Sequence, residues 1–209
     1  MDDIFAEAID IGQVLTDNNL YSELLAFQDL QQRKLFLLGE VNQYSIPEII
    51  KSILQYNKDD EGIAPEDRKP IRLFIMSPGG EEFSGYGLID AIEYSVTPVY
   101  TINIGYALSM AFMIGLAGHK RYSTKNAIFL MHDGINVYAN SGAKCRDAME
   151  FQAVTDERDK QYVVSHSTIT ADEYDKMFRN EVYMLADKAK ERGCVDLIIG
   201  VDCDISEVL

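Results

Sequence analysis

The segment VYTINIGYALSMAFMIGLAG, residues 99–118, decides the fold class because two apolar patterns meet in it. Its first part, VYTINI, is rich in β-branched and aromatic residues, as expected of a buried strand. The part that follows is apolar almost without interruption and predicts a helix beginning near Ser109. A strand that leads into a helix is half of a βαβ unit, and a single serine hydroxyl lies at the junction.

The same alternation of strand and helix precedes this segment. Short apolar runs are separated by helical patterns and by the glycine-containing turn SPGG at residues 77–80. Repeated βαβ units predict an α/β fold with a mainly parallel sheet covered by helices. Ser45 is a candidate N-cap, and Pro47 lies in the first turn of its helix. We expect strands at 35–41, 71–76 and 99–104, and helices at 20–34, 45–57 and 85–95.

The second half of the chain has a different pattern. Strand segments in RYSTKNAIFLMHDG are followed by one long, charged, amphipathic helix over residues 142–165. This helix has too few apolar positions to belong to the core. Its residues Ala148, Met149 and Phe151 either contact the same segment of another subunit or lie on a solvated arm.

Composition limits the function classes. The chain has 209 residues, of which 34 are acidic and 19 are basic, so its formal net charge is -15. This charge disfavours binding to nucleic acid. The acidic N-terminus is not a secretory signal, and the longest apolar run falls short of the roughly 20 residues of a membrane span, which predicts a cytoplasmic protein without a membrane segment. The cysteines lack paired spacing, so we expect neither disulfides nor a metal site: Cys145, Cys194 and Cys203.

A serine becomes a nucleophile when a neighbouring base, usually a histidine, removes its proton. The chain offers three histidines. We expect His119 and His166 to be exposed, because the first lies in a polar loop and the second at the end of the long helix. His132 ends an apolar strand beside a glycine, so it is the candidate base, although a structural strand-end histidine is the alternative. Taken alone, Ser109 is better explained as a helix cap.

The turn SPGG adds a third element. Adjacent glycines after an apolar strand permit backbone conformations that direct amide N–H groups into a cleft. Together with the N–H group of the residue after Ser109, such an amide would form an oxyanion hole for acyl transfer.

The motifs SPGG, GYALSMA and FLMHDG, in this order and spacing, resemble those of the ClpP family, the proteolytic subunits of the ATP-dependent Clp proteases (peptidase family S14). The similarity extends from about residue 20 to about residue 199. It implies that Ser109 is the nucleophile and His132 the general base, and that the N–H groups of Gly80 and Met110 form the oxyanion hole. The order serine then histidine, without G-x-S-x-G, also argues against an α/β-hydrolase.

The third catalytic member departs from the family pattern. Ungapped alignment places Glu181 where the family has aspartate, and Asn180 or Asp133 are possible substitutes. A second departure concerns partner docking. The family docks its ATPase through an aromatic pair on the strand before SPGG, and here Phe74 is retained, Arg72 replaces the other aromatic residue, and Tyr94 is a further docking candidate.

The resemblance also implies an architecture: a crotonase-like or ClpP-like fold with a head domain and a protruding long handle helix. Residues 18–209 would form one protease domain with 133–165 as the handle region, and residues 1–17 would be an axial gate, a propeptide or a helix. The implied assembly is two stacked heptameric rings of this chain, coupled to an AAA+ ATPase unfoldase. The substrate would be polypeptide, hydrolysed without a cofactor.

Two alternatives stay open. The first is an inert or weakly active ring subunit that completes a ring with an active relative. This would explain Arg72, Asn180 and the missing aspartate together. The second is an acyl-CoA enzyme, because the crotonase scaffold also uses paired backbone amides as an oxyanion hole.

Overall fold

The α/β class is confirmed in a computed structural model that describes residues 18–209. The predicted N-terminal segment 1–17 lies outside the described residues. The chain divides into two units, residues 1–34 and residues 35–209. The described part of the first unit consists mainly of helix α2, Asn18–Gln31.

The first half of the second unit follows the predicted alternation of strands and helices. The polar loop between α3 and β2 contains one short 3-10 turn, Pro65–Asp67. The other elements are β1 (Lys34–Leu38), α3 (Ile46–Asp59), β2 (Ile71–Ser77), α4 (Glu82–Glu93), β3 (Val99–Leu108) and α5 (Met110–Leu116).

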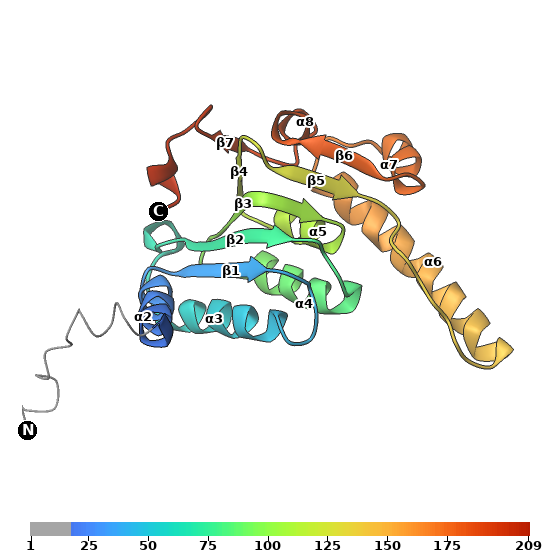
Figure 1. The fold of residues 1–209 in the computed structure, drawn as a ribbon, viewed down its shortest axis with the longest axis horizontal. Coiled ribbons are helices and arrows are strands. Elements are labelled where there is room, and N and C mark those ends of the chain that lie inside the picture. The colour runs from blue at the N-terminus through green and yellow to red at the C-terminus, as the bar shows by residue number, and fades with distance from the viewer. Residues whose placement is uncertain (1–17) are drawn as a thin grey trace, which may run out of the picture. The chain divides into compact units, whose positions relative to one another are not determined.

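The second half contains the predicted long helix, α6, with the predicted bounds Gly142–Ser165. Figure 1 shows α6 continuing past the ends of the strands. The shorter elements around it are β4 (Lys120–Thr124), β5 (Ile128–Met131), α7 (Ala171–Phe178), β6 (Val182–Leu185), α8 (Ala186–Glu191), β7 (Leu197–Ile199) and a 3-10 turn (Ile205–Glu207).

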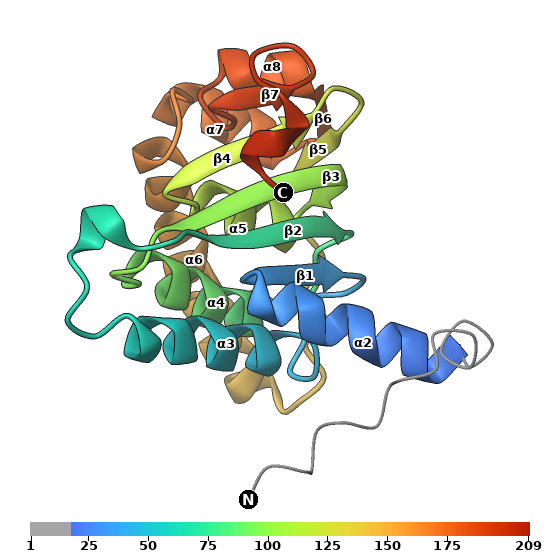
Figure 2. The same cartoon turned by 90° about the vertical axis from the view of Figure 1, so that its left-hand side faces the viewer.

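The sheet contains seven strands among the described residues, in the order β1-β2-β3-β4-β7, with β5 and β6 branching from β3 (Figure 2). The first half of β3 pairs with β4 and its second half pairs with β5, both in parallel. Strand β6 is antiparallel to β5. The branch places the carboxyl ends of β3 and β5 side by side, where loops of a parallel sheet commonly carry a site.

The main core lies between the sheet and helices α3, α4 and α5. Leu73 and Ile75 of β2 belong to the same fully buried cluster as Ile53 of α3, Leu88 of α4 and Ile114 of α5. Alternation along β2 places Phe74 on the opposite face, in a smaller cluster that also contains buried residues of β3 and β4.

Strand β3 extends four residues beyond the predicted end at residue 104. Gly105 lies within the extension, and its missing side chain leaves space for Met76, whose sulfur would lie 3.1 Å from an added Cβ. The extension carries the chain to Ser109 in extended conformation, so the serine directly follows a hydrogen-bonded strand.

Three local predictions were wrong. Ser45 occupies the N-cap position of α3 without capping it: its hydroxyl accepts the Asn42 N–H at 3.0 Å, and not an N–H of the helix, and donates to the Glu40 carbonyl at 2.7 Å. The last third of α6 is part of the core, since Tyr162 and Val163 are buried there. His166 is half-buried, with its Nε2 atom 2.9 Å from a Glu93 carboxylate oxygen. His119 is exposed as expected, and its Nδ1 accepts the Val99 N–H.

Candidate active site

Ser109 has a strained backbone at the junction of β3 and α5. Its φ of 54° and ψ of -125° lie where few residues other than glycine are found. The conformation is fixed on both sides: the Ser109 N–H donates to the Leu130 carbonyl at 2.9 Å, and the Ser109 carbonyl accepts the Phe112 N–H at 2.9 Å. The hydroxyl does not cap the helix, so the alternative role of Ser109 as a cap is not the one observed.

The SPGG turn packs directly against this junction. Gly79 has a φ of +89°, and a Cβ atom there would lie 2.5 Å from the Leu108 carbonyl oxygen and 2.8 Å from the Ser109 Cβ. Gly80 has a φ of +147°, and its Cβ would lie 2.2 Å from the Val41 carbonyl oxygen. Both positions therefore require glycine on two grounds, backbone conformation and space.

Two backbone amides beside Ser109, one in the turn and one at the start of α5, have no acceptor in the described part of the chain. Val41 bonds to the residues on either side of Gly80: its N–H donates to the Gly79 carbonyl and its carbonyl accepts the Glu81 N–H, both at 2.8 Å. The Gly80 N–H therefore points away from that ladder, and within residues 18–209 neither it nor the Met110 N–H donates a hydrogen bond. Free amides beside a serine are the elements of an oxyanion hole.

His132 reaches the serine through strand pairing. Leu108 pairs with Leu130 in the parallel ladder of β3 and β5, so Ser109 and His132 follow immediately at the ends of neighbouring strands. The His132 side chain is 21% exposed. No hydrogen bond joins the Ser109 hydroxyl to the imidazole among the described residues.

Glu181 lies opposite His132 by register. Met131 pairs with Val182 in the antiparallel ladder of β5 and β6, and one further step brings residues 132 and 181 together. A Glu181 carboxylate oxygen lies 3.9 Å from the His132 Nδ1, within ion-pair range but too far for a hydrogen bond. The Glu181 side chain is 65% exposed.

The two possible substitutes for Glu181 are less well placed. Asn180 is exposed and donates its side-chain amide to the Lys176 carbonyl at 2.7 Å, in the turn that ends α7. Asp133 is exposed and follows His132 directly. Of the three candidates, Glu181 is the one with an ion-pair contact to His132.

A cavity of about 540 Å³ opens beside the serine. It is lined by all four residues to which the resemblance assigns the nucleophile, the base and the oxyanion hole: Ser109, His132, Gly80 and Met110. Apolar side chains from α4, α5 and α6 line its remainder, among them Phe83, Phe112 and Phe151. The volume is in the range of sites that bind small molecules.

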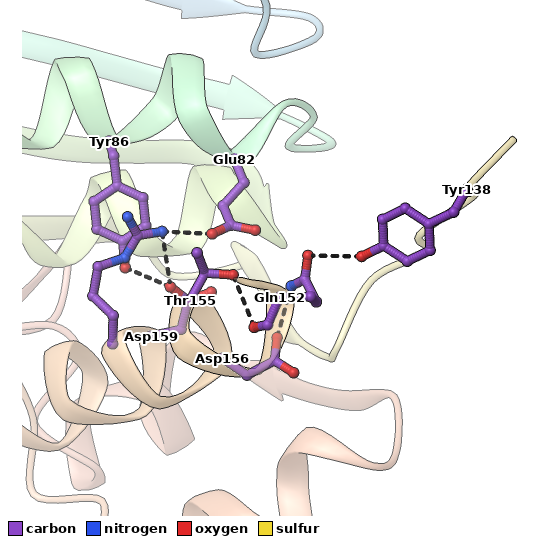
Figure 3. A network of polar contacts seen from close by, with 8 residues as sticks. Glu82, Tyr86, Tyr138, Gln152, Thr155, Asp156 and Asp159 are labelled. Carbon is purple, nitrogen blue, oxygen red and sulfur yellow. Dashed lines mark hydrogen bonds and ion pairs between the residues drawn. The ribbon is translucent and has the colours of Figure 1, made fainter. Parts of the chain in front are cut away.

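One side of the cavity is polar and formed by facing residues of α4 and α6. Figure 3 shows Glu82 and Tyr86 of α4 facing Asp159 of α6, while Asp156 of the same helix is bonded to Gln152. The Tyr86 hydroxyl donates to Asp159 at 2.7 Å. The guanidinium of Arg158 donates to Glu82, and its central carbon lies 3.6 Å from the centre of the Tyr86 ring. The helices are thus joined at the cavity by charge-assisted hydrogen bonds.

Burial changes the acidity of this network. The pKa of Asp159 is raised from 3.8 to about 6, mainly because burial disfavours the charged carboxylate and also because Glu82 is close, while the hydrogen bond from Tyr86 acts in the opposite direction. Burial and the Asp159 charge raise the pKa of Tyr86.

The sequence did not predict that residues of α6 line the cavity. Ala148 and Phe151 were expected at a contact with another subunit or on a solvated arm, and both line the cavity of their own chain. A signal was available in the spacing of Thr155, Tyr162 and Val163, the helix positions that are buried.

The predicted docking residues lie on different layers of the molecule. Phe74 is 8% exposed and stacks on Phe36 with ring centres 5.1 Å apart, on the sheet face opposite the main core. Arg72 shares that face by alternation along β2. Tyr94 is 79% exposed at the end of α4, in the helical layer.

A family model described as Clp protease matches residues 18–202, nearly the whole described chain. The chain belongs to the Clp protease family. The matched range contains the SPGG turn, Ser109, His132 and Glu181, and membership supports a serine peptidase in general. Within residues 18–209 of this Clp protease family member, no helix is long and apolar enough to cross a membrane, and no group of three potential ligands is placed to hold a metal ion.

Proposed function

We propose that this chain hydrolyses peptide bonds through an acyl-enzyme, with Ser109 as nucleophile and His132 as general base. One observation carries the proposal: the parallel pairing of β3 and β5 brings the two residues into one cavity with two amides that have no acceptor. The strained backbone of Ser109 supports it, because such strain concentrates at functional sites.

In the proposed reaction the Ser109 hydroxyl attacks the peptide carbonyl while His132 takes its proton. The N–H groups of Gly80 and Met110 donate to the resulting oxyanion. When the intermediate collapses, the carbon–nitrogen bond breaks and His132 returns its proton to the leaving amine. Water then attacks the acyl-enzyme with His132 again as base, which releases the acid product and restores Ser109.

Glu181 would orient His132 and stabilise its charged form. The gap of 3.9 Å to Nδ1 and the missing bond from Ser109 to His132 must both close for catalysis. Catalytic hydrogen bonds often tighten only when substrate or a neighbouring subunit is present, so we assign this closure to the assembled, substrate-bound state.

The test is intact-mass analysis after incubation with a fluorophosphonate, which forms a covalent adduct with an activated serine. We expect one adduct per chain in the wild type, none in Ser109→Ala, and a loss of about three orders of magnitude in rate or more in His132→Ala. Glu181→Gln should slow labelling. A wild-type ring that assembles without labelling would contradict the proposal.

An inert ring subunit is the second candidate function, and the open geometry between Ser109, His132 and Glu181 is the observation that favours it. Such a subunit would assemble but neither react with the probe nor cleave peptides. Co-purification with an active relative, followed by labelling of that relative alone, would establish this alternative.

The finer features of the proposal follow the family. Residues 18–209 would form one protease domain, with 133–165 as a handle between two stacked heptameric rings in the cytoplasm. An AAA+ unfoldase would dock near Arg72, Phe74 and Tyr94 and supply unfolded polypeptide. Sedimentation of the full chain tests the rings: a species of fourteen chains is expected, and a stable monomer would contradict it.

A further inference from the structure

The charged side chains that line the cavity beside Ser109 are mostly of one sign. Its charged lining is acidic apart from His132, and no lysine or arginine lines it among the described residues. This acidic lining comes from three elements of the chain, the start of α4, the loop after β5 and α6. It consists of Glu81, Glu82, Asp133, Asp156 and Asp159.

Internal cations balance only part of this charge. Arg158 pairs with Glu82 and lies 3.5 Å from Asp159, so one arginine serves two carboxylates. Asp156 accepts a hydrogen bond from the neutral Gln152 amide at 2.7 Å and has no basic partner within residues 18–209. The acidic lining therefore keeps a net negative charge at neutral pH.

The same cavity also offers apolar surface. Three phenylalanine rings line it: Phe83 of α4, Phe112 of α5 and Phe151 of α6. The rings of Phe83 and Phe151 contact each other, with centres 6.3 Å apart. A long side chain with an apolar stem and a cationic end matches this arrangement, because lysine and arginine bury their methylene groups while the charged end finds polar partners.

The chemistry of an acyl-enzyme says which substrate residue occupies the cavity. The carbonyl carbon of the acyl residue is bonded to Ser109, so its side chain must lie in the space that Ser109 itself lines. The leaving amine departs past His132 and is replaced by water. The acyl residue, immediately before the cleaved bond, is therefore the one that meets the acidic lining.

We propose that the cavity selects peptides with lysine or arginine immediately before the cleaved bond, through Asp156 and Asp159 of α6. The inference rests on the proposed function, because it assigns the cavity to the acyl residue. The raised pKa of Asp159 agrees with it, since a carboxylate that is costly to ionise when unpaired gains most from an added cation.

The test measures binding and cleavage separately. In the full-length Ser109→Ala variant, fluorescein-labelled peptides that end in lysine, norleucine or glutamate are compared by anisotropy; norleucine keeps the stem of lysine and lacks the charge. We expect the lysine peptide to bind about tenfold more tightly than the norleucine peptide, with a preference that decreases in high salt. In the wild type, coumarin-amide substrates with the same three residues should give the same order of kcat/KM.

Substitutions locate the preference. Asp156→Asn should reduce the lysine-to-norleucine ratio severalfold, and Asp159→Asn should do the same. Glu157→Gln is the matched control on the same helix, because Glu157 bonds to Gln161 and does not line the cavity. It should leave the ratio unchanged. Because Asp156 is only half-buried, its variant tests the proposal even where Asp159→Asn folds poorly.

The outcomes separate the two proposals. Equal binding of lysine and norleucine peptides, or a preference for norleucine, overturns the inference, whether or not Ser109 reacts with a fluorophosphonate. Selective binding of lysine without labelling or cleavage supports the inference about the cavity while the proposed peptidase activity fails.

Discussion

The serine side and the histidine side of the cavity are built differently. On the serine side, Ser109 is fixed by backbone hydrogen bonds, and Gly79, which has a positive φ, packs against it without space for a methyl group. On the histidine side, His132 precedes an exposed loop, and Glu181 is 65% exposed and 3.9 Å from it. In the proposed reaction, the nucleophile and the oxyanion hole would thus be preformed in the single chain, whereas the His132 Nδ1 still lies 3.9 Å from the Glu181 carboxylate.

This difference indicates where assembly can act. A preformed oxyanion hole costs no reorganisation during the reaction, so it benefits from rigid packing. The histidine side, which lacks such packing, is the part that a neighbouring subunit or a substrate can align. Activity would then depend on the assembled state more through His132 than through Ser109.

The largest effect is expected for Gly79→Ala. Its Cβ would lie 2.5 Å from the Leu108 carbonyl oxygen in a backbone with φ of +89°, so the turn and the β3 end must both move. We expect labelling of Ser109 to fall by about two orders of magnitude or more, with a loss of about 2–4 kcal/mol in unfolding free energy. Fluorophosphonate kinetics and urea denaturation measure the two effects.

Gly134→Ala is the matched control on the histidine side. Gly134 also has a positive φ, of +73°, but nothing lies within 4 Å of its added Cβ. We expect a cost of about 1 kcal/mol from backbone strain alone, with labelling close to wild type. Similar losses of labelling in both variants would remove the proposed contrast between the two sides.

The contrast also explains what could be predicted from the sequence. The alternation of apolar segments predicted the α/β class. The positive φ values of Gly79 and Gly80 are a local property, so a motif of adjacent glycines indicates them, although the atoms that leave no space for a side chain belong to Leu108 and Val41. The contacts of His132 are not local: its relation to Glu181 follows from the register of β5 and β6. An ungapped alignment placed Glu181 where the family has aspartate, but it gave no separation between the Glu181 and His132 side chains.

The long helix shows a second limit of the sequence. Its charged residues suggested a surface position, yet Asp159 lies in a buried network between α4 and α6. Pairing with Tyr86 and Arg158 makes that burial possible. Tyr86 and Asp159 are 73 residues apart in sequence, so their hydrogen bond leaves no local sequence pattern.

A smaller effect is expected for Glu181→Gln. An exposed ion pair contributes at most about 1 kcal/mol, so kcat/KM for a peptide substrate should fall about fivefold, while His132→Ala removes activity. Asp133→Asn is the control, since Asp133 has no ion pair with His132 among the described residues. A loss of about four orders of magnitude for Glu181→Gln would mean that the glutamate is buried beside His132 in the working assembly.

The smallest effect concerns stability and pH at the acidic lining between the two sides. The carboxyl of Asp159 binds its proton more tightly in the folded chain, with a pKa of about 6 against an ordinary 3.8, so its contribution to stability is present at low pH and is lost as pH rises through 6. Asp159→Asn imitates the neutral form of the side chain and keeps an oxygen that accepts the hydrogen bond from Tyr86. It also removes the negative charge that Glu82 repels. Relative to wild type, the variant should therefore gain up to about 1 kcal/mol in unfolding free energy at pH 7.5, and the gain should be smaller at pH 4.5.

Urea denaturation of both proteins at the two pH values measures this difference in unfolding free energy. The variant could instead be less stable than wild type by the same amount at both pH values. That result would mean that the ion pair with Arg158 outweighs the cost of burying the charge, so that Asp159 stays ionised in the folded chain.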